Sequence, residues 1–207
     1  MARPEKYVIG VDEAGRGSLA GPITAGAVAV PLYFRFCSDA PGMLRDPKRM
    51  TPGRRAEWMK YIVMHPRLLY TASSVSPGVI DREHITGAAN TAAARAVSRL
   101  LQKVLNAECL VKYILTDGLL RPNLSNARYQ IKCREIVKGD EKVRAIQLAA
   151  VVAKVTRDRK MIRLARLYPE YGFERHKGYG TRMHKEMLGK CGVSDIHRLT
   201  FLYGIDY

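Results

Sequence analysis

Residues 7–17, YVIGVDEAGRG, form an apolar run that ends abruptly in two carboxylates and a glycine-flanked arginine. The run Tyr7–Val11 is rich in β-branched residues and predicts a buried strand. Asp12 and Glu13 at its end are costly to bury unless their charge is compensated. Mg²⁺ and Mn²⁺ prefer hard oxygen ligands, so one interpretation is a divalent-metal site. The other is that the two carboxylates only close the strand and pair with nearby arginines.

A second strand end further along the chain also carries a carboxylate. Residues 110–116 (LVKYILT) predict a strand, and Asp117 follows it directly, with a glycine behind. Sites in such sheets form where strands end near a switch in strand order, which is where Asp12 and Asp117 are expected to lie. The glycines beside Arg16 have no Cβ and leave backbone N–H groups accessible to a ligand. The sequence therefore predicts a metal site beside an exposed backbone clamp.

The charge of the chain is strongly unbalanced. The 207 residues hold 35 Lys and Arg against 19 Asp and Glu, a net charge of +16. Such an excess indicates a polyanionic partner, nucleic acid before anionic membrane. No apolar run reaches the length of a membrane span, and the N-terminal MARPEK lacks the apolar core of a signal peptide. The widely spaced Cys37, Cys109, Cys133 and Cys191 argue against zinc and for reduced thiols, so a cytoplasmic protein without membrane contact is expected.

The rest of the pattern predicts strands that alternate with helices. Further strands are expected at 23–32, 68–75 and 129–137, and the last is polar enough for a sheet edge. The strand over 23–32 follows the strand that begins at Tyr7 closely enough for the two to pair antiparallel. Helices are expected from Thr51-Pro52 and over 86–106, 142–167 and 181–189, and Ile146 and Ile162 are expected to face inward. The fold class is therefore α/β, a mixed five-stranded sheet flanked by helices. We expect one domain over 1–207, with a core of about 1–167 and a helical or irregular extension of about 168–207.

Five stretches resemble the successive motifs of the ribonuclease HII family, in that family's order: YVIGVDEAGRGSLAGP, LTDG, VKGDEKV, AKVTRDR and YGFERHKGYGTRMH. The likeness extends from about residue 7 to 199. It implies a ribonuclease H-like fold with a C-terminal helical extension. It also implies a divalent-metal endonuclease that acts on RNA–DNA hybrids and on DNA duplexes containing ribonucleotides, with a role in ribonucleotide removal during replication and repair. We expect a monomer.

The resemblance also implies which residues carry the chemistry. Four carboxylates would be catalytic and hold two divalent cations, Mn²⁺ or Mg²⁺: Asp12, Glu13, Asp117 and Asp158. Two such ions can serve the attacking water, the phosphate and the leaving 3′ oxygen together. Without the resemblance, the pattern of Asp158 between Arg157 and Arg159 on a helix indicates only a charged side chain exposed to solvent. Adjacent strand residues point to opposite faces, so the strand is expected to end or twist between Asp12 and Glu13.

A second set is implied to bind the substrate: Gly15, Arg16, Gly17, Tyr179, Lys48, Lys142 and Lys154. The glycine-flanked turn and the Tyr179 hydroxyl would read the 2′-OH, the feature that distinguishes a single ribonucleotide from its neighbours. The alternatives are a packing role for Tyr179 and an ion pair between Lys154 and Asp158, one helical turn apart. His176 and His184 are further candidates for substrate contact, whereas His65, His84 and His197 are expected to be structural.

Two segments depart from the family's pattern. Residues 46–50, DPKRM, stand where the family has DSKKL, and residues 144–150, RAIQLAA, lack the family's proline and serines. These departures support a rival hypothesis, a non-catalytic basic protein that binds hybrid or structured RNA through a degenerate version of this fold. The four carboxylates argue against it, because a phosphate-binding groove gains nothing from four negative charges.

Overall fold

Five strands form one mixed sheet, as predicted. They are β1 (Lys6–Ala14), β2 (Ile23–Pro31), β3 (Leu69–Val75), β4 (Leu110–Asp117) and β5 (Lys132–Ile136), in the order β3-β2-β1-β4-β5. β1 pairs antiparallel with β2, as expected, and so does β2 with β3, whereas β1–β4 and β4–β5 are parallel. The polar β5 is an edge strand. The computed structural model describes residues 4–36, 38–118, 120–124 and 131–204, so Cys37 and residues 129–130 of the predicted edge strand lie outside the described part.

The helices follow the predicted order with shifted boundaries. They are α1 (Pro52–Met64), α2 (Pro77–Asn106), α3 (Gly139–Lys142), α4 (Arg144–Leu167), α5 (Phe173–His176), α6 (Arg182–Cys191) and α7 (Leu199–Leu202), with short 3₁₀ helices η1 (Pro47–Arg49) and η2 (Pro169–Tyr171). The hydroxyl of Thr51 accepts the Arg54 N–H and caps α1, as its sequence predicts. The extension therefore holds more helix than the one segment expected near 181–189.

Helix α2 begins earlier than the sequence predicts. The expected start was residue 86, but the helix starts at Pro77, directly after the strand β3 and the N-cap position Ser76. Proline at the first helical position is favourable because its missing N–H has no partner there in any case. His84 interrupts the helix with φ 58° and ψ 161°. The helix over 86–106 is thus the second part of a kinked helix.

Helix α4 begins two residues later than expected. Val143 has the extended conformation φ −116° and ψ 113°, which separates α3 from α4. Ile146 faces the core as predicted, but Ile162 is 41% exposed, and its neighbour Met161 is buried instead. Near the C-terminal end of α4, the residue that points to the core is therefore one position earlier than the sequence predicts.

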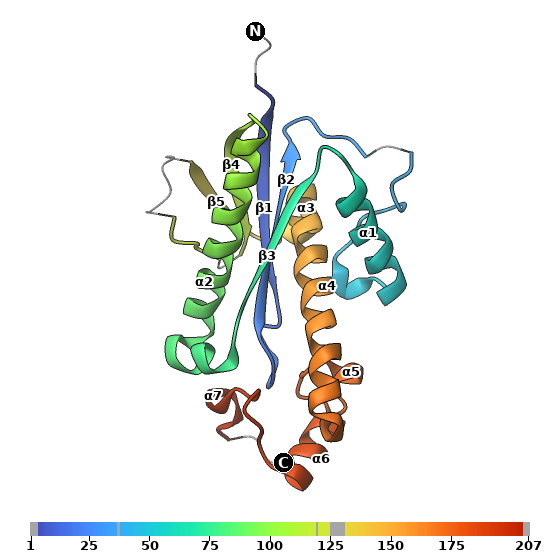
Figure 1. The fold of residues 1–207 in the computed structure, drawn as a ribbon, viewed down its shortest axis with the longest axis vertical. Coiled ribbons are helices and arrows are strands. Elements are labelled where there is room, and N and C mark those ends of the chain that lie inside the picture. Colours follow the sequence, from blue (N-terminus) through green and yellow to red (C-terminus); the bar gives the residue numbers. More distant parts are fainter. Residues whose placement is uncertain (1–3, 37, 119, 125–130, 205–207) are drawn as a thin grey trace.

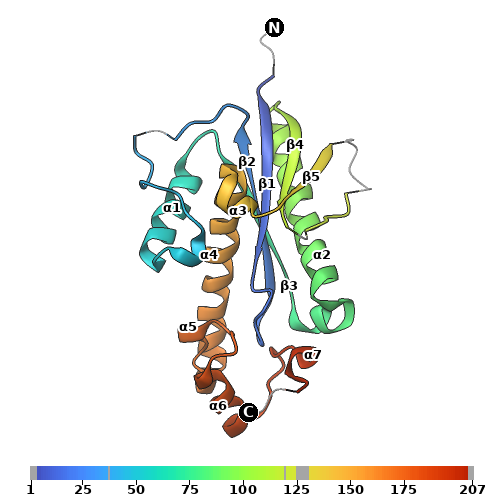
Figure 2. The same cartoon turned by 180° about the vertical axis from the view of Figure 1, so that it is seen from behind.

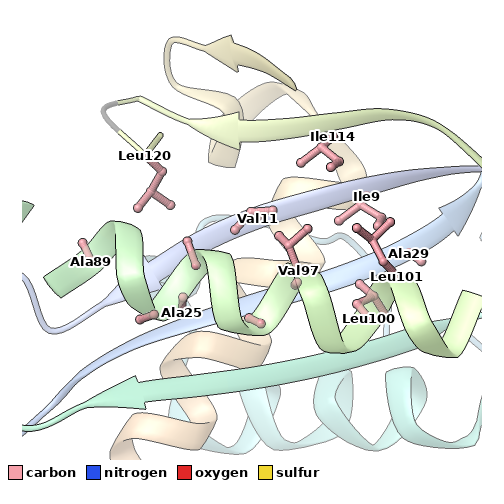
Figure 3. Close-up of a cluster of buried hydrophobic side chains, with 14 of the residues drawn as sticks. Ile9, Val11, Ala25, Ala29, Ala89, Val97, Leu100, Leu101, Ile114 and Leu120 are labelled. Atoms are coloured by element: carbon pink, nitrogen blue, oxygen red, sulfur yellow. The ribbon is translucent and has the colours of Figure 1, made fainter. Parts of the chain in front are cut away.

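Helices cover both faces of the sheet (Figure 1). Helix α2 packs on one face in a cluster with β1, β2 and β4 (Figure 3), which includes Ile9, Val11, Ala25, Ala29, Val97, Leu100, Leu101 and Ile114. Helices α1 and α4 pack on the other face around Trp58 and Leu148. Alternate residues of β1 serve the two clusters, since Ile9 and Val11 face α2 and Val8 faces α4.

Two glycines bring α4 into direct contact with the sheet. A Cβ on Gly10 of β1 would lie 2.1 Å from the carbonyl carbon of Ala145, and one on Gly26 of β2 would lie 2.4 Å from the Ala149 oxygen. The helix backbone therefore rests on the backbones of the two central strands. This contact places the first half of α4 beside the carboxyl end of β1.

The C-terminal segment packs against the far end of α4. Met161 and Ala165 of α4 form a cluster with Tyr171, Phe173 and Leu188. Figure 2 shows α5 and α6 at this end of α4, with α7 beside them below β1. Within the described ranges, no helix is both long and apolar enough to cross a membrane. Cys109, Cys133 and Cys191 are free thiols, as expected.

Candidate active-site cleft

A cleft at the carboxyl ends of β1 and β4 gathers most of the candidate residues. Its volume is about 620 Å³. Its lining includes Asp12, Glu13, Gly15, Arg16, Gly17, Lys48, Asp117, Lys154 and Tyr179 from the predicted sets, together with Asp46, Pro47, Arg55 and Ala150. Segments near both ends of the chain thus meet around one space.

Asp12 and Asp117 lie side by side. The parallel register pairs Val11 with Thr116, and each aspartate is the next residue on its strand. The Glu13 N–H donates to Asp12 Oδ1 at 2.7 Å, and a backbone N–H from the start of α3 donates to Asp117 Oδ1 at 2.6 Å. The strand does not end between Asp12 and Glu13, because β1 stays paired with β2 as far as Ala14, and both side chains still line the cleft.

Burial and like charge act together on the carboxylates of the cleft. Asp12 is only 7% exposed, and burial raises its pKa well above the usual range, with further increases from the charges of Glu13 and Asp117. Burial and the charge of Asp117 also raise the pKa of Asp140. Carboxylate oxygens that repel one another in this way are a donor set that suits a divalent cation.

Asp140 was not singled out from the sequence, although it lies within the VKGDEKV motif. It sits at the start of α3, next to the glycine whose N–H binds Asp117. Lys48 Nζ lies 4.0 Å from Asp140 Oδ2. Burial lowers the pKa of Lys48, but the charges of Asp46, Asp12 and Asp140 outweigh burial and raise it overall. Lys48 therefore carries its positive charge in the cleft.

Asp158 lies apart from the other three predicted carboxylates. On α4 it pairs with Lys154 Nζ at 2.8 Å and with Arg55 Nη2 at 3.6 Å, so the ion-pair alternative holds for Lys154. Glu13 Oε1 pairs with Arg16 Nε at 2.8 Å. Among the residues that the structure describes, no three His, Cys, Asp or Glu side chains come close enough to hold a metal ion. Of the four predicted carboxylates, Asp12, Glu13 and Asp117 therefore line one cleft, and Glu13 and Asp158 are each paired with a basic side chain.

A second cleft of about 470 Å³ adjoins the first and contains Asp158. The two share Arg55, Lys154 and Tyr179. Its charged lining is mostly basic: Arg55, Lys154, Arg159, Arg175 and Lys177, against the single acid Asp158. The two clefts are thus continuous, and the second is the more basic of the two.

The departing loop of residues 46–50 still presents its lysine to the cleft. Asp46 Oδ1 accepts the Lys48 N–H at 2.9 Å and caps η1. Arg55 Nη1 donates to the carbonyls of Pro47 and Met50 at 2.9 and 2.6 Å and holds the loop against α1. Nothing near Arg55 in the sequence signalled this role. Lys142, by contrast, lines neither cleft and donates to the Val137 carbonyl at 3.2 Å.

The two parts of the predicted 2′-OH reader lie together. Ser18 and Tyr179 form an antiparallel bridge, and the N–H groups of Leu19 and Ala20 donate to the Gly178 carbonyl at 2.8 and 3.2 Å. Tyr179 is 36% exposed, and Lys154 Nζ lies 5.6 Å from its ring centroid. Tyr179 therefore lies partly exposed at the border of the two clefts.

A chain of neutral histidines supports the Tyr179 turn from inside. His184 Nδ1 lies 3.0 Å from the Tyr179 carbonyl, so this nitrogen must carry the proton. His184 Nε2 then accepts from His197 Nε2 at 3.0 Å, and His197 Nδ1 accepts the Ser194 N–H at 3.1 Å. His184 is fully buried, so its predicted substrate contact is wrong. His176 is buried too but borders the second cleft, and His197 is structural as expected.

Comparison with known proteins adds the family context. The sequence model of the family described as Ribonuclease HII matches residues 9–203. The chain is 39% identical to ribonuclease HII of Treponema denticola over 93% of this chain and 96% of that protein, and 39% identical to that of Chlamydia pneumoniae over 94% and 82%. The structure resembles ribonuclease H2 from Pyrococcus horikoshii with a TM-score of 0.74, at 27% identity over 94% of this chain and 93% of that one. It also shares the fold of Bst-RNase HIII in complex with Mn²⁺, with a TM-score of 0.68 at 17% identity over 95% and 67%. The ribonuclease H-like fold is thereby confirmed.

Proposed function

Because the chain belongs to the ribonuclease HII family and is a ribonuclease H, we propose that it cuts the phosphodiester 5′ to a ribonucleotide. Its substrates are RNA–DNA hybrids and DNA duplexes with single embedded ribonucleotides, and its products end in 3′-hydroxyl and 5′-phosphate. The observation that carries this proposal is the common cleft of Asp12 and Asp117 with the Gly15–Gly17 turn and Tyr179. A phosphodiester next to a recognised 2′-OH would lie against the carboxylates.

We propose that two divalent cations, Mg²⁺ or Mn²⁺, bind to Asp12, Glu13, Asp117 and Asp158. When bound, such ions supply charge neutralisation at the phosphate and lower the pKa of a water molecule. The all-oxygen donor set and the raised pKa of Asp12 support this assignment. Glu13 and Asp158 now pair with Arg16 and Lys154. Exchange of these partners for cations would free both basic side chains to contact phosphates.

The turn of residues 15–17 and Tyr179 are proposed to read the ribonucleotide. Gly15 has φ 95°, a conformation that favours glycine, and a Cβ on Gly17 would meet no atom within 4 Å. The turn therefore leaves room for a sugar to approach its N–H groups. The Tyr179 hydroxyl is proposed to bind the 2′-OH while the ring packs on the sugar or base.

The second cleft is proposed to hold backbone phosphates beyond the cut. Its basic residues suit a polyanion, and it is continuous with the first cleft through Arg55 and Lys154. Lys48 is proposed to contact a phosphate from the other side of the carboxylates, and Lys142, outside both clefts, a phosphate further along the backbone. We further propose one domain over 1–207 acting as a cytoplasmic monomer in ribonucleotide removal during replication and repair.

The test uses three end-labelled duplexes: DNA with one ribonucleotide, an RNA–DNA hybrid, and DNA alone. Each is incubated with the protein in Mg²⁺, in Mn²⁺ and in chelator. We expect metal-dependent nicks 5′ to the ribonucleotide and in the hybrid, with the all-DNA duplex intact. Cutting in chelator would refute the metal assignment, and cutting of hybrid alone would refute the reading of single ribonucleotides.

The rival hypothesis of a non-catalytic binder is not favoured. The chain matches ribonuclease HII enzymes over nearly its whole length, and the departures at residues 46–50 and 144–150 leave the cleft intact. Ala145, Ala149 and Ala150 of the second departure are buried small residues where α4 meets the sheet. Binding of the single-ribonucleotide duplex by folded protein without cutting in either metal would revive that hypothesis.

A further inference from the structure

Two arginines lie fully buried beneath the turn of residues 15–22, which we call the reader turn. They are Arg157 of α4 and Arg198, immediately before α7. In the described part of the chain, neither forms an ion pair with a carboxylate. Their hydrogen bonds go to backbone carbonyls of the reader turn instead.

Arg157 supports both ends of the reader turn. Its Nε donates to the Pro22 carbonyl at 2.9 Å and its Nη2 to the Ala20 carbonyl at 3.2 Å. A Cβ on Gly15 would lie only 2.0 Å from Arg157 Nε, so the Gly15 backbone rests directly on the guanidinium. The start and the end of the turn are thus fixed on one planar group.

Arg198 supports the middle of the reader turn. Its Nε donates to the Gly21 carbonyl at 3.0 Å and its Nη1 to the Arg16 carbonyl at 2.9 Å. Its own N–H donates to the Leu19 carbonyl at 2.8 Å. Arg16, the residue between the two reader glycines, lines the cleft and is therefore held from the interior through its carbonyl.

Arg157 also contacts the second half of the reader. Its guanidinium carbon lies 5.3 Å from the centroid of the Tyr179 ring, and Tyr179 bridges to Ser18 within the reader turn. The Arg157 side chain therefore contacts both the reader turn and the Tyr179 ring, and it fixes their relative position. A displacement of Arg157 would move the two halves relative to each other.

Burial of these two arginine side chains costs free energy that a purely packing role does not explain. Arg157 Nη1 and Arg198 Nη2 are buried without a hydrogen-bond partner. Burial lowers the pKa of Arg157, and it lowers that of Arg198 to about 9 with a further contribution from the charge of Arg157. Apolar side chains of similar volume would fill the space without burying two like charges. The fork-shaped donors, however, supply the hydrogen bonds that the buried carbonyls of this turn need.

We infer that Arg157 and Arg198 are positioning residues for ribonucleotide recognition, which hold the reader turn and Tyr179 in the arrangement that meets the 2′-OH. This inference rests on the proposed function. It requires the planar fork and not only the charge, so lysine at either position is insufficient.

The experiment measures kcat and KM of the full chain on the single-ribonucleotide duplex and on a continuous RNA–DNA hybrid. The variants are Arg157→Lys and Arg198→Lys, with Arg163→Lys, an exposed arginine of the same helix, as the matched control. We expect the ratio of kcat/KM for the single ribonucleotide over that for the hybrid to fall about tenfold or more in both buried variants, mainly through kcat, because misplacement of a reader reduces rate more than ground-state binding. The control keeps the wild-type ratio.

A variant with both Tyr179→Phe and Arg157→Lys distinguishes positioning of the reader from a role in the stability of the whole fold. With Tyr179→Phe already present, Arg157→Lys should reduce the ratio by much less, because part of the reader has been removed. A folded Arg157→Lys or Arg198→Lys enzyme with the wild-type ratio overturns the inference, since a purely structural defect lowers both rates equally. Failure of both variants to fold, seen by thermal unfolding, also overturns it, because the arginines then support the whole fold. Wild-type protein that cuts hybrid but no single ribonucleotide refutes the proposed function itself.

Discussion

At the scale of single residues, burial and the repulsion of like charges both act against the charged form of Asp12. It lies beside Asp117 and before Glu13 with little exposure, and each of these neighbours raises its pKa. Such a site is unfavourable for folding and favourable for binding a cation. Function and stability are therefore expected to respond to this residue in opposite directions.

Replacement of Asp12 by asparagine tests that conflict. We expect Asp12→Asn to lower kcat on the single-ribonucleotide duplex by about a thousandfold or more, because a proposed cation ligand is lost. The free energy of unfolding in chelator should not fall, because the amide oxygen can still accept the Glu13 N–H and the buried charge is gone. Binding, measured by fluorescence anisotropy, should change little. Asp39→Asn, at an exposed loop position, is the control, and turnover by Asp12→Asn close to the wild-type rate would contradict the assignment.

The residues that the sequence identified differ in kind from those it did not. Asp12 and Asp117 each follow an apolar strand, and this local signal placed them in one cleft correctly. Arg157 carries no such signal, because an arginine next to Asp158 on a helix reads as a solvated charge. Its burial arises from the reader turn, which folds over it from a distant part of the chain. Packing of this kind is not encoded in local spacing.

At the scale of elements, the contact of α4 with β1 controls the site. Gly10 permits this contact, and α4 carries Lys154, Arg157 and Asp158. The nearest atoms to a Cβ on Gly10 belong to the helix backbone, so no flexible side chain can move aside. Any added atom must displace the helix.

We therefore expect Gly10→Ala to lower the free energy of unfolding by about 1–3 kcal/mol or more, as overpacking does. Cleavage should fall as well, because the displaced helix carries site residues. Denaturant titration and the nicking assay measure the two effects. Gly53→Ala in α1, where a Cβ meets no atom within 4 Å, should leave cleavage unchanged and stability equal or slightly raised. Equal behaviour of the two variants would show that α4 can adapt.

The histidine chain of the extension predicts a pH dependence. Burial lowers the pKa of His184 to about 4 and also lowers those of His197 and His176. Unfolded histidine titrates near 6.5, so below that pH the unfolded chain binds protons that the folded chain does not. Stability is therefore complete above about pH 6.5 and decreases as the pH falls toward 4, by about 3 kcal/mol for His184 alone.

Chemical unfolding between pH 7 and 4 measures this slope. His184→Gln should flatten it by close to one proton. Equal slopes in wild type and His184→Gln would mean that His184 accepts its proton without loss of the fold.

Element boundaries were less predictable than element types. The five strands followed from apolar runs, and the antiparallel pairing of the first two followed from their short separation in the sequence. The start of α2 did not, because Ser76 and Pro77 fit the end of a strand as well as the start of a helix. The kink at His84 has no local sequence signal, since glycine or asparagine more often takes a positive φ.

At the scale of the whole molecule, the net charge of +16 and the basic second cleft predict salt-sensitive binding. About six phosphate contacts would give a slope near −5 in a plot of log K against log salt. Arg175→Gln in the second cleft should reduce the slope by about 0.9. Arg99→Gln on α2, across the sheet, should not change it. Binding of the inactive Asp12→Asn protein over a range of KCl concentrations gives these slopes, and equal slopes for the two variants would exclude the second cleft as a phosphate site.

The bond between Arg198 and the Arg16 carbonyl spans 182 residues of chain. Ribosomes deliver the N-terminal part of a protein first, so β1, β2 and β3 can pair while the segment with Tyr179 and Arg198 is still unmade. A growing chain therefore contains Asp12, Glu13 and Asp117 before it contains Tyr179 and Arg198, which the recognition of a ribonucleotide requires. We expect a chain that stops before Arg198 to bind hybrid and all-DNA duplexes with similar affinity, so that discrimination is the last property that synthesis confers on this nuclease.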